Sequence, residues 1–220
     1  MSAGAKRSRK MFLHFFPKGF SDEKYFDWER GYKQAAHEQW NEVLNQSAFR
    51  ALLKKKEFTT IAAHAVRIES RTNLLFSFEK MALRDGIKTV EGAQVFAEGL
   101  YEFLHGAGKM ENKFERWREA IAALPRKQTR VLTWTNLTVF PFLAQSEKHI
   151  FLKPNTTRNA AREYGFEFQY KSRPSWETYK NLLEFAETIR RDQRDLRPRD
   201  MLDLQSFIWV IGSEEYKNFL

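Results

Sequence analysis

The sequence predicts a mainly helical α+β protein: a compact helical domain with a small β-sheet in its C-terminal half. Up to residue 125, apolar residues recur at helical spacing in five successive segments. Beyond that point, four short segments are rich in β-branched and aromatic residues, which favour strands. The chain has 220 residues, of which 42% are hydrophobic, so it can bury a sizeable core without disulfide bonds or metal ions.

We expect one compact domain over residues 11–220, preceded by a mobile basic tail over residues 1–10. The tail places four cations among small residues and has nothing to bury; these cations are Lys6, Arg7, Arg9 and Lys10. No Pro-rich or Gly/Ser-rich linker separates the helical half, residues 21–125, from the mixed half, residues 126–220. The two halves are therefore expected to share one core.

The first helix is expected to begin after Ser21, a candidate N-cap. Asp22 and Glu23 then occupy the first turn, where the helix dipole favours acids. The face expected to be buried is rich in aromatic residues and consists of Tyr25, Trp28, Tyr32, Ala35, Ala36, Trp40 and Val43. A second helix is predicted from Ser47 to the lysine run at residues 54–56.

Three further helices are predicted before Pro125. The longest covers residues 60–85 and ends at Gly86, since glycine readily terminates a helix. The next covers residues 89–105 and ends at Gly106. The third covers residues 109–124 and is stopped by Pro125, which lacks the N–H that a continuing helix needs.

After Pro125, the candidate strands of the small sheet are residues 130–134, 138–140, 150–152 and 166–170. A short helix over residues 157–164, closed by Gly165, is expected between the last two strands. A long helix over residues 175–196 follows. Pro198 then opens a final helix that runs to Ile211, because proline suits the first position of a helix.

The charge balance favours acidic partners. The chain has 37 Lys and Arg against 28 Asp and Glu, a net charge of +9. The excess is +5 in residues 1–60 (12 basic, 7 acidic), zero in residues 61–125 (9 and 9) and +4 in residues 126–220 (16 and 12). Basic regions at both ends of a chain attract nucleic acid or anionic lipid over long range.

Several classes of function lose their usual support. The chain has no cysteine, which excludes disulfide bonds, thiolate nucleophiles and thiolate zinc sites. Its five histidines are scattered, and neither glycine-rich nucleotide-binding motifs nor G-x-S-x-G occur. We therefore expect no cofactor and no metal site. Because no apolar run is long enough to span a membrane, we expect a soluble, cytoplasmic protein.

The leading hypothesis is a protein that binds the phosphate backbone of nucleic acid, with DNA or RNA left open. On the helix predicted from residue 175, the apolar face continues into three arginines at i, i+4 and i+7, and guanidinium groups match phosphate oxygens in bidentate geometry. Aromatic residues of the same half offer stacking surfaces: Trp134, Tyr170, Trp176 and Tyr179. Besides the basic tail, the expected contacts are Arg126, Lys127, Arg130, Arg190, Arg194 and Arg197.

Polar residues on apolar helix faces support a second hypothesis, an enzyme that acts on a phosphodiester or a nucleotide. Glu79 lies in the middle of the apolar stripe of helix 60–85, and Arg199, Asp203 and Ser206 form a narrow polar strip on the final helix. A buried carboxylate needs a cation, several hydrogen bonds or a proton. The first interpretation is a structural network in which Arg199 pairs with Asp203. The alternatives are a catalytic site built from Glu79, Arg199 and Asp203 with Lys153 as a further candidate, or metal binding by Asp200 together with Asp203.

A third hypothesis is a protein-interaction subunit of a larger assembly. The aromatic segment at residues 11–20 would then be an anchor donated to a partner protein. The sequence does not predict an oligomeric state.

Overall fold

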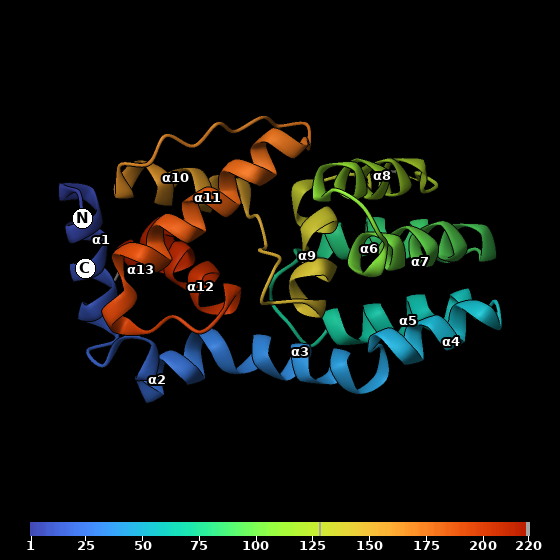
Figure 1. Ribbon diagram of the computed structural model, residues 1–220, viewed down its shortest axis with the longest axis horizontal. Helices are drawn as coiled ribbons and strands as arrows, with labels where there is room; N and C mark the ends of the chain where they lie inside the picture. Colours follow the sequence, from blue (N-terminus) through green and yellow to red (C-terminus); the bar gives the residue numbers. More distant parts are fainter. Residues whose placement is uncertain (128, 219–220) are drawn as a thin grey trace.

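The structure, a computed structural model, describes residues 1–127 and 129–218, and every regular element in that part of the chain is a helix. Figure 1 shows two groups of helices at opposite ends of the molecule. Helix α3 (Gly31–Val43) runs along one side of both groups, and α9 (Trp134–Ala144) lies between them. All 11 residues of α9 are buried, so this helix forms the centre of the core.

The first group contains the first and the last helix of the described chain. Its helices are α1 (Ala3–Phe15), α10 (Pro154–Tyr164), α11 (Trp176–Asp192), α12 (Met201–Gly212) and α13 (Glu214–Lys217). Two glycines allow these helices to approach closely. A Cβ atom on Gly212 would meet the backbone carbonyl of Thr156 in α10, and one on Gly4 of α1 would meet that of Tyr164. The helices therefore pack backbone to backbone around the almost entirely buried α12.

The second group consists of α4 (Gln46–Lys54), α5 (Phe58–Glu69), α6 (Ser77–Gly86), α7 (Val90–His105) and α8 (Met110–Ala123). Short turns complete the described chain: η1 (Gly19–Ser21), α2 (Glu23–Tyr25), the π-helical turn η2 (Phe26–Arg30) and η3 (Arg194–Leu196). None of the helices in the described ranges is long and apolar enough to cross a membrane.

The predicted C-terminal sheet is wrong, because residues 1–127 and 129–218 contain no strand. Most of the first two candidate strands, residues 130–134 and 138–140, falls within or beside helix α9. Strand propensity measures how well a side chain fits a half-buried pleated surface. A helix that is buried on every side accommodates the same valine, threonine and phenylalanine side chains, and it needs no partner strand for its hydrogen bonds.

Residues 166–170, another candidate strand, are an irregular segment that uses side chains in place of a partner strand. The N–H of Gln169 donates to Oδ1 of Asn181 at 2.8 Å. Thr178 accepts from the N–H of Lys171 at 3.1 Å and donates to the carbonyl of Gln169 at 2.8 Å. Helix α11 therefore satisfies this backbone directly. Residues 150–152 are also irregular.

Helix α9 contains a proline in its interior, and the neighbouring helix compensates for it. Pro141 has no N–H, so the carbonyl of Leu137, four residues earlier, loses its usual helical donor. The indole N–H of Trp117 in α8 donates to that carbonyl at 2.9 Å. The hydrogen bond links α8 to the central helix and leaves no buried carbonyl unsatisfied at this position.

Replacing Trp117 with phenylalanine is expected to lower the free energy of unfolding by about 1–2 kcal/mol, because the buried Leu137 carbonyl then loses its donor. Urea unfolding followed by circular dichroism measures the change. Trp28→Phe provides the control, since Trp28 is about half-exposed. Equal losses for the two variants would contradict this role of the indole N–H.

The first ten residues, expected to be a mobile tail, are instead mostly part of helix α1. Ser2 caps this helix by accepting a hydrogen bond from the N–H of Ala5 at 3.1 Å. Gly4, Ala5 and Ser8 are buried, with α1 packed on α10. The small residues that suggested disorder are the ones that let α1 come close to its neighbour.

The long helix predicted over residues 60–85 is interrupted between α5 and α6. Thr72 donates to the carbonyl of Glu69 at 2.8 Å, and its hydroxyl accepts from the N–H of Leu74. Helix α6 then begins with a capping interaction in which Glu79 accepts from the N–H of Phe76 at 2.7 Å. Side chains with oxygen acceptors thus compete with the helical hydrogen bonds and break the helix.

Candidate functional site

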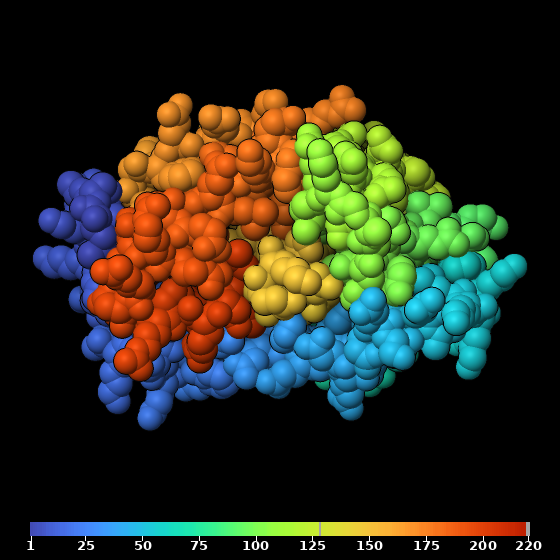
Figure 2. All heavy atoms as spheres, viewed as in Figure 1, coloured from blue at the N-terminus to red at the C-terminus, as the bar shows by residue number. Residues whose placement is uncertain are grey.

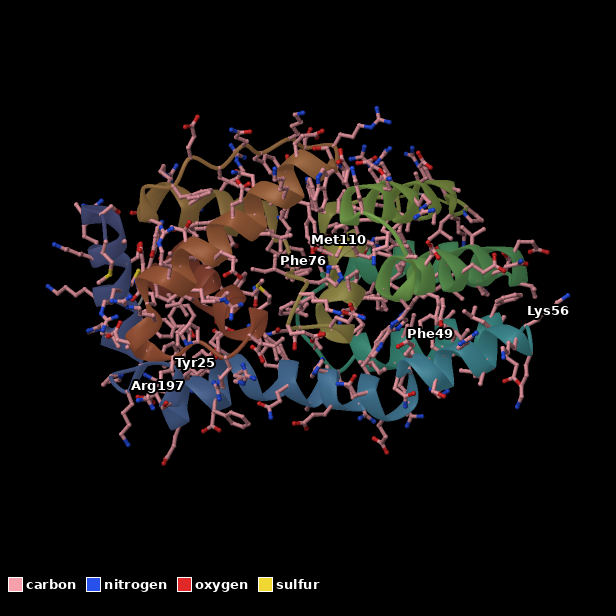
Figure 3. The ribbon with its side chains drawn as sticks, viewed as in Figure 1. Tyr25, Phe49, Lys56, Phe76, Met110 and Arg197 are labelled. Carbon is pink, nitrogen blue, oxygen red and sulfur yellow. The ribbon has the colours of Figure 1, made fainter. Side chains whose placement is uncertain are left out.

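A pocket of about 100 Å³ lies where the two groups of helices meet α3 and α12; we call it the central pocket. Its polar lining includes Glu29, Lys33, Lys153 and Gln205, and its aromatic lining consists of Trp28, Tyr32, Phe76, Phe151 and Trp209. Figure 2 shows the yellow part of the chain at the surface between the red C-terminal helices and the green helices. Figure 3 places Phe76 in this middle region of the molecule.

The charges beneath the pocket come from one face of the helical stretch formed by α2, η2 and α3. Tyr25, Glu29, Lys33, Ala36 and Trp40 recur at intervals of three or four residues and are all buried. Trp28, expected on the buried face, is 51% exposed. The π-helical turn adds a residue to this part of the helix and changes which side chains face inward.

Lys33 and Glu29 form a buried ion pair in the floor of the pocket. Lys33 is only 1% exposed; its Nζ lies 3.3 Å from Glu29 and donates to Oγ of Ser206 at 2.8 Å. Tyr216 donates to the other oxygen of Glu29 at 2.6 Å. Burial lowers the pKa of Lys33 and raises the pKa of Glu29, and each charge opposes the shift of the other. Burial disfavours the charged form of each side chain, and the opposite charge of its partner offsets this cost.

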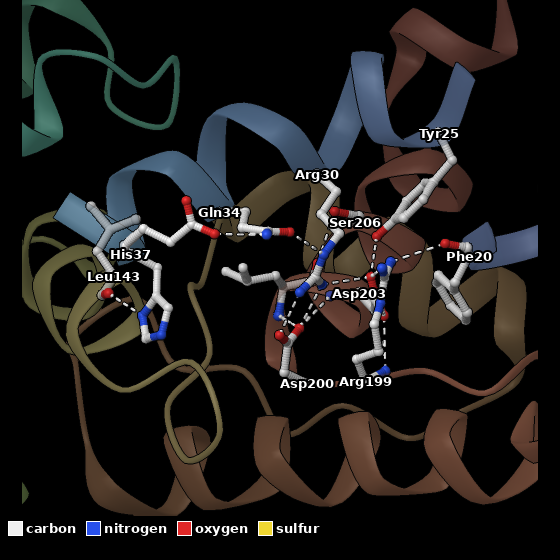
Figure 4. A network of polar contacts seen from close by, with 12 residues as sticks. Phe20, Tyr25, Arg30, Gln34, His37, Leu143, Arg199, Asp200, Asp203 and Ser206 are labelled. Carbon is white, nitrogen blue, oxygen red and sulfur yellow. Dashed lines mark hydrogen bonds and ion pairs between the residues drawn. The ribbon is translucent and has the colours of Figure 1, made fainter. Parts of the chain in front are cut away.

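A second group of charges surrounds Asp203, whose side chain is completely buried (Figure 4). Its carboxylate accepts hydrogen bonds from Tyr25 at 2.6 Å, from Arg30 at 2.8 Å and from Nε of Arg199 at 2.9 Å. Arg30 also binds Asp200 at 2.7 Å, so its guanidinium group lies between the two acids. This cation occupies the position that a metal shared by Asp200 and Asp203 would need.

The structure brings three of the four expected network residues together. Ser206 links to the Lys33 pair, while Arg199 and Asp203 belong to the neighbouring Arg30 group. Glu79 lies apart from them: it accepts from the hydroxyl of Thr135 and lies 3.9 Å from Nζ of Lys153, which lines the central pocket. Two separate ion pairs thus contribute to the lining of the pocket, Lys33 with Glu29 and Lys153 with Glu79.

Lys153 fixes the wall of the pocket formed by the loop before α6. Its Nζ donates to the carbonyl of Leu74 at 2.9 Å and lies 3.5 Å from the centre of the Phe76 ring. Burial lowers the pKa of Lys153, while the nearby Glu79 acts in the opposite direction. The cation therefore orients an aromatic ring that is itself 55% exposed.

The predicted arginine ridge does not form a single helical face. Helix α11 ends at Asp192; Arg194 falls in η3, and Arg197 adopts a left-handed backbone conformation with φ of 55°. Arg190 lies 3.2 Å from Glu187, whereas Arg194 and Arg197 are exposed. Asp195 binds Arg9 at 2.6 Å, which places the basic residues of α1, with Lys6, Arg7 and Lys10 exposed, beside η3.

Arg126, Lys127 and Arg130, the third expected basic group, are exposed and lie at a different place. Lys127 lines a hollow of about 130 Å³ together with Phe78 and Met81 of α6. Phe78, 57% exposed, stacks on Phe76 with ring centres 5.8 Å apart and ring planes 22° from parallel. We call Phe76 and Phe78 the aromatic platform. It lies between Lys127 and the mouth of the central pocket.

Two expectations about aromatic residues do not match the structure. Trp134 and Tyr179 are buried in the core, while Tyr170 and Trp176 are partly buried. In the aromatic segment at residues 11–20, expected as an anchor for a partner, all four phenylalanines are buried. Phe12 and Phe16, for example, pack against Tyr25. These side chains are occupied within the chain itself.

Sequence reasoning missed Glu29, Arg30, Lys33 and Gln205, which build most of the site. For Glu29 and Lys33 the signal was their position on the same helical face as Tyr25 and Trp40, whereas Arg30 lies off that face and gave no such signal. Gln205 lies on a helix that is apolar nearly all round, so its amide was a candidate buried polar group. In the described residues, no cluster of His, Asp and Glu is arranged to hold a metal ion.

Comparison with models of protein families, with curated proteins and with solved structures finds no match for this chain.

Proposed function

We propose that the protein binds single-stranded nucleic acid, and that the aromatic platform is its principal contact. The observation that carries this proposal is the pair of exposed, mutually stacked rings of Phe76 and Phe78 beside Lys127. Large aromatic side chains are normally buried, so two adjacent exposed rings mark an interaction surface. Because Lys127 lies beside these rings, we infer a ligand that has both flat rings and negative charge.

Single strands provide that combination along their whole length. An unpaired base offers a flat face that stacks on an aromatic side chain, and each stacked base contributes about 1–3 kcal/mol to binding. The phosphate between bases is attracted by nearby lysine and arginine. The net charge of +9 also attracts the negatively charged strand over long range.

The exposed cations at the other end of the molecule extend the proposed surface for a longer strand. The Arg9–Asp195 ion pair brings α1, which carries the exposed Lys6 and Lys10, beside η3, which carries Arg194 and is followed by Arg197. This group contains no stacked aromatic pair, so we assign it phosphate contacts alone. The proposal covers DNA and RNA, because stacking and phosphate contacts occur with both.

The test is fluorescence anisotropy with labelled single-stranded DNA and RNA over a range of salt concentrations. We expect binding at low salt that weakens linearly on a logarithmic salt scale, because cations on the protein displace counterions from phosphates. Lys127→Ala is expected to reduce the slope of that line by about one. Absence of binding to either nucleic acid at low salt would overturn the proposal.

Phe78→Ala is expected to weaken binding about tenfold at every salt concentration, because the variant loses one stacking surface. Since Phe78 is exposed, the fold should be retained, and circular dichroism checks this. Val90→Ala, which shortens another exposed apolar side chain, is the matched control and should leave affinity unchanged. Equal affinities for Phe78→Ala and the parent would contradict the role of the platform.

The enzyme hypothesis gains no support from the geometry. Glu79 and Asp203, the proposed catalytic acids, are both occupied by hydrogen-bond donors of the protein. Glu79 caps the start of α6 and lies near Lys153, and Asp203 pairs with Arg30. These structural contacts explain why both carboxylates are buried.

A further inference from the structure

A groove of about 610 Å³ lies along the exposed side of helix α10; we call it the α10 groove. Ligand sites typically have volumes of about 300–1,000 Å³. Figure 1 shows the segment between α10 and α11 running back along α10, and both line the groove. Helix α10 contributes Asn155, Arg158, Asn159 and Arg162, and the following segment contributes Phe166 and Phe168. The groove therefore combines two guanidinium groups with two aromatic rings.

The two arginines share one face of α10 because they are four residues apart. The buried face of this helix, which includes Thr157, Ala160 and Tyr164, packs on α12 and α1. Arg158 and Arg162 are both exposed. A helix rises about 6 Å over four residues, so the two guanidinium groups can contact one phosphate group or two neighbouring ones.

Neither arginine of the groove forms an ion pair within residues 1–127 and 129–218. Glu214, the acid in the lining, lies instead 3.6 Å from Lys217, and that lysine also lies 3.5 Å from Glu163. Other exposed helical arginines have an acidic neighbour; Arg116, for example, lies 3.2 Å from Glu102. Two unmatched cations in one groove favour an anionic ligand.

Contacts with the protein hold both arginines in place and leave hydrogen-bond donors free. The guanidinium carbon of Arg158 lies 5.2 Å from the centre of the Tyr170 ring, and such a cation–π contact uses none of the N–H donors. Nη2 of Arg162 donates to Oδ1 of Asn159 at 3.2 Å. The amide of Asn159 donates in turn to the carbonyl of Gly212 at 3.4 Å. The remaining donors match the oxygens of a phosphate group.

The rings of the groove favour nucleic acid over other phosphate-bearing ligands. Phe166 is half-buried and stacks on Phe185 with ring centres 4.7 Å apart. Phe168, also half-buried, has its ring centre 6.1 Å from that of Tyr170. Proteins that bind single strands place aromatic side chains beside cations, because a base lies next to each phosphate. A phosphopeptide or a lipid headgroup supplies the phosphate without the neighbouring flat ring.

We infer that the α10 groove is a second contact site for the bound strand, in which Arg158 and Arg162 bind phosphate oxygens and Phe166 and Phe168 contact an adjacent base. The inference rests on the proposed function and adds a second site to the aromatic platform.

Helix α10 begins beside the aromatic platform. Lys153 is the N-cap residue of α10, and its Nζ lies 3.5 Å from the centre of the Phe76 ring. Arg158 follows Lys153 by five residues, a rise of about 7.5 Å along a helix. A strand that stacks on the platform therefore lies close to the helix that carries the groove.

The experiment measures the affinity of the full chain for labelled oligothymidylate of about sixteen nucleotides, the upper end of usual single-strand site sizes. Arg158→Ala and Arg162→Ala are each expected to weaken binding about fivefold at low salt. Each should also reduce the slope of the logarithmic salt dependence by about 0.7, the contribution of one phosphate contact on a single strand.

Arg116→Ala is the matched control. It removes another exposed helical arginine and changes the net charge equally, but this arginine is paired with Glu102. The control should leave the slope unchanged. Circular dichroism checks that all three variants retain the fold, which is expected because the substituted side chains are exposed.

Phe168→Leu tests the contact with a base, because leucine keeps the side chain apolar but removes the ring. We expect binding to weaken about threefold at every salt concentration while the slope stays the same, since stacking does not displace counterions. Unchanged affinity in a folded variant would overturn the assignment of a base to the groove.

The possible outcomes separate the groove from the platform. If Phe78→Ala weakens binding while Arg158→Ala and Arg162→Ala behave like Arg116→Ala, the groove inference is overturned and the platform proposal stands. If only the two groove variants weaken binding, the platform proposal fails and the groove inference stands. If no strand binds at low salt, both are overturned. Cosedimentation with vesicles of phosphatidylserine and phosphatidylcholine, lost in the two groove variants, would then assign the arginines to a lipid headgroup.

Discussion

Replacing Asp203 with asparagine is expected to lower the free energy of unfolding by about 3–5 kcal/mol, which is a large fraction of the stability of an ordinary domain. The carboxylate is fully buried and accepts from Tyr25, Arg30 and Arg199. Asparagine keeps the shape but removes the negative charge. The buried guanidinium of Arg30 is then left with Asp200 as its sole acidic partner in this cluster.

Urea unfolding at constant pH measures the loss. Asp195→Asn is the matched control, because Asp195 also binds an arginine, Arg9, at 2.6 Å, but at the surface. Exposed ion pairs contribute less than about 1 kcal/mol. The two variants thus remove the same chemical group from pairs that differ in burial. Similar losses would show that the Asp203 cluster is not a major source of stability.

Much of the helical half could be predicted from the sequence because its helices have clear apolar periodicity and clear ends. The segments predicted over residues 89–105 and 109–124 correspond to α7 and α8, whose ends are set by a threonine N-cap, a glycine and a proline. The mainly helical class is confirmed. These features are local, so they can be read without knowledge of neighbouring helices.

The prediction of a small sheet was wrong because the structure of these segments depends on the neighbouring helices, which the local sequence does not reveal. Residues 138–140 have strand-like composition but lie in α9, which is enclosed on all sides. Whether a short apolar segment forms a strand or a buried helix depends on the number of faces that its neighbours cover. For residues 166–170, the deciding groups were Thr178 and Asn181, on a helix that follows later in the chain.

The candidate site was only partly predictable. Glu79, Asp203 and Ser206 were found because a projection of the sequence onto a helix shows a polar residue on an otherwise apolar face. Lys33 and Glu29 were missed because the aromatic residues Trp28 and Tyr32 suggested that a different face of the helix is buried. The π-helical turn determines which of the two faces points into the core. The contacts between these groups join residues about 170 or more positions apart, such as Lys33 with Ser206 and Glu29 with Tyr216.

Acidification is expected to destabilise the protein through one buried histidine. His149 is almost completely inaccessible and packs against Phe103, and its Nδ1 lies 3.2 Å from the hydroxyl of Tyr179. Burial, with smaller contributions from the charges of Lys113 and Lys148, lowers the pKa of His149 to about 3. The folded protein therefore keeps this imidazole neutral at pH values where the unfolded chain protonates it.

The sign and size of the effect follow from the two pKa values. Above about pH 6.5, neither state binds the proton and stability is unaffected. Between about pH 6.5 and pH 3, the unfolded chain alone is protonated, so the free energy of unfolding falls by about 1.4 kcal/mol per pH unit. At pH 5 the loss amounts to about 2 kcal/mol.

His149→Asn isolates this contribution, because asparagine does not titrate in this range. The variant should be less stable than the parent at pH 7, since it leaves space in the core, but the difference between the two should shrink by about 2 kcal/mol at pH 5. Urea unfolding at both pH values gives the four free energies required, and His14→Asn, at an exposed position, is the control. A gap between parent and His149→Asn that stays constant from pH 7 to pH 5 would show that the buried imidazole is not kept neutral in the folded state.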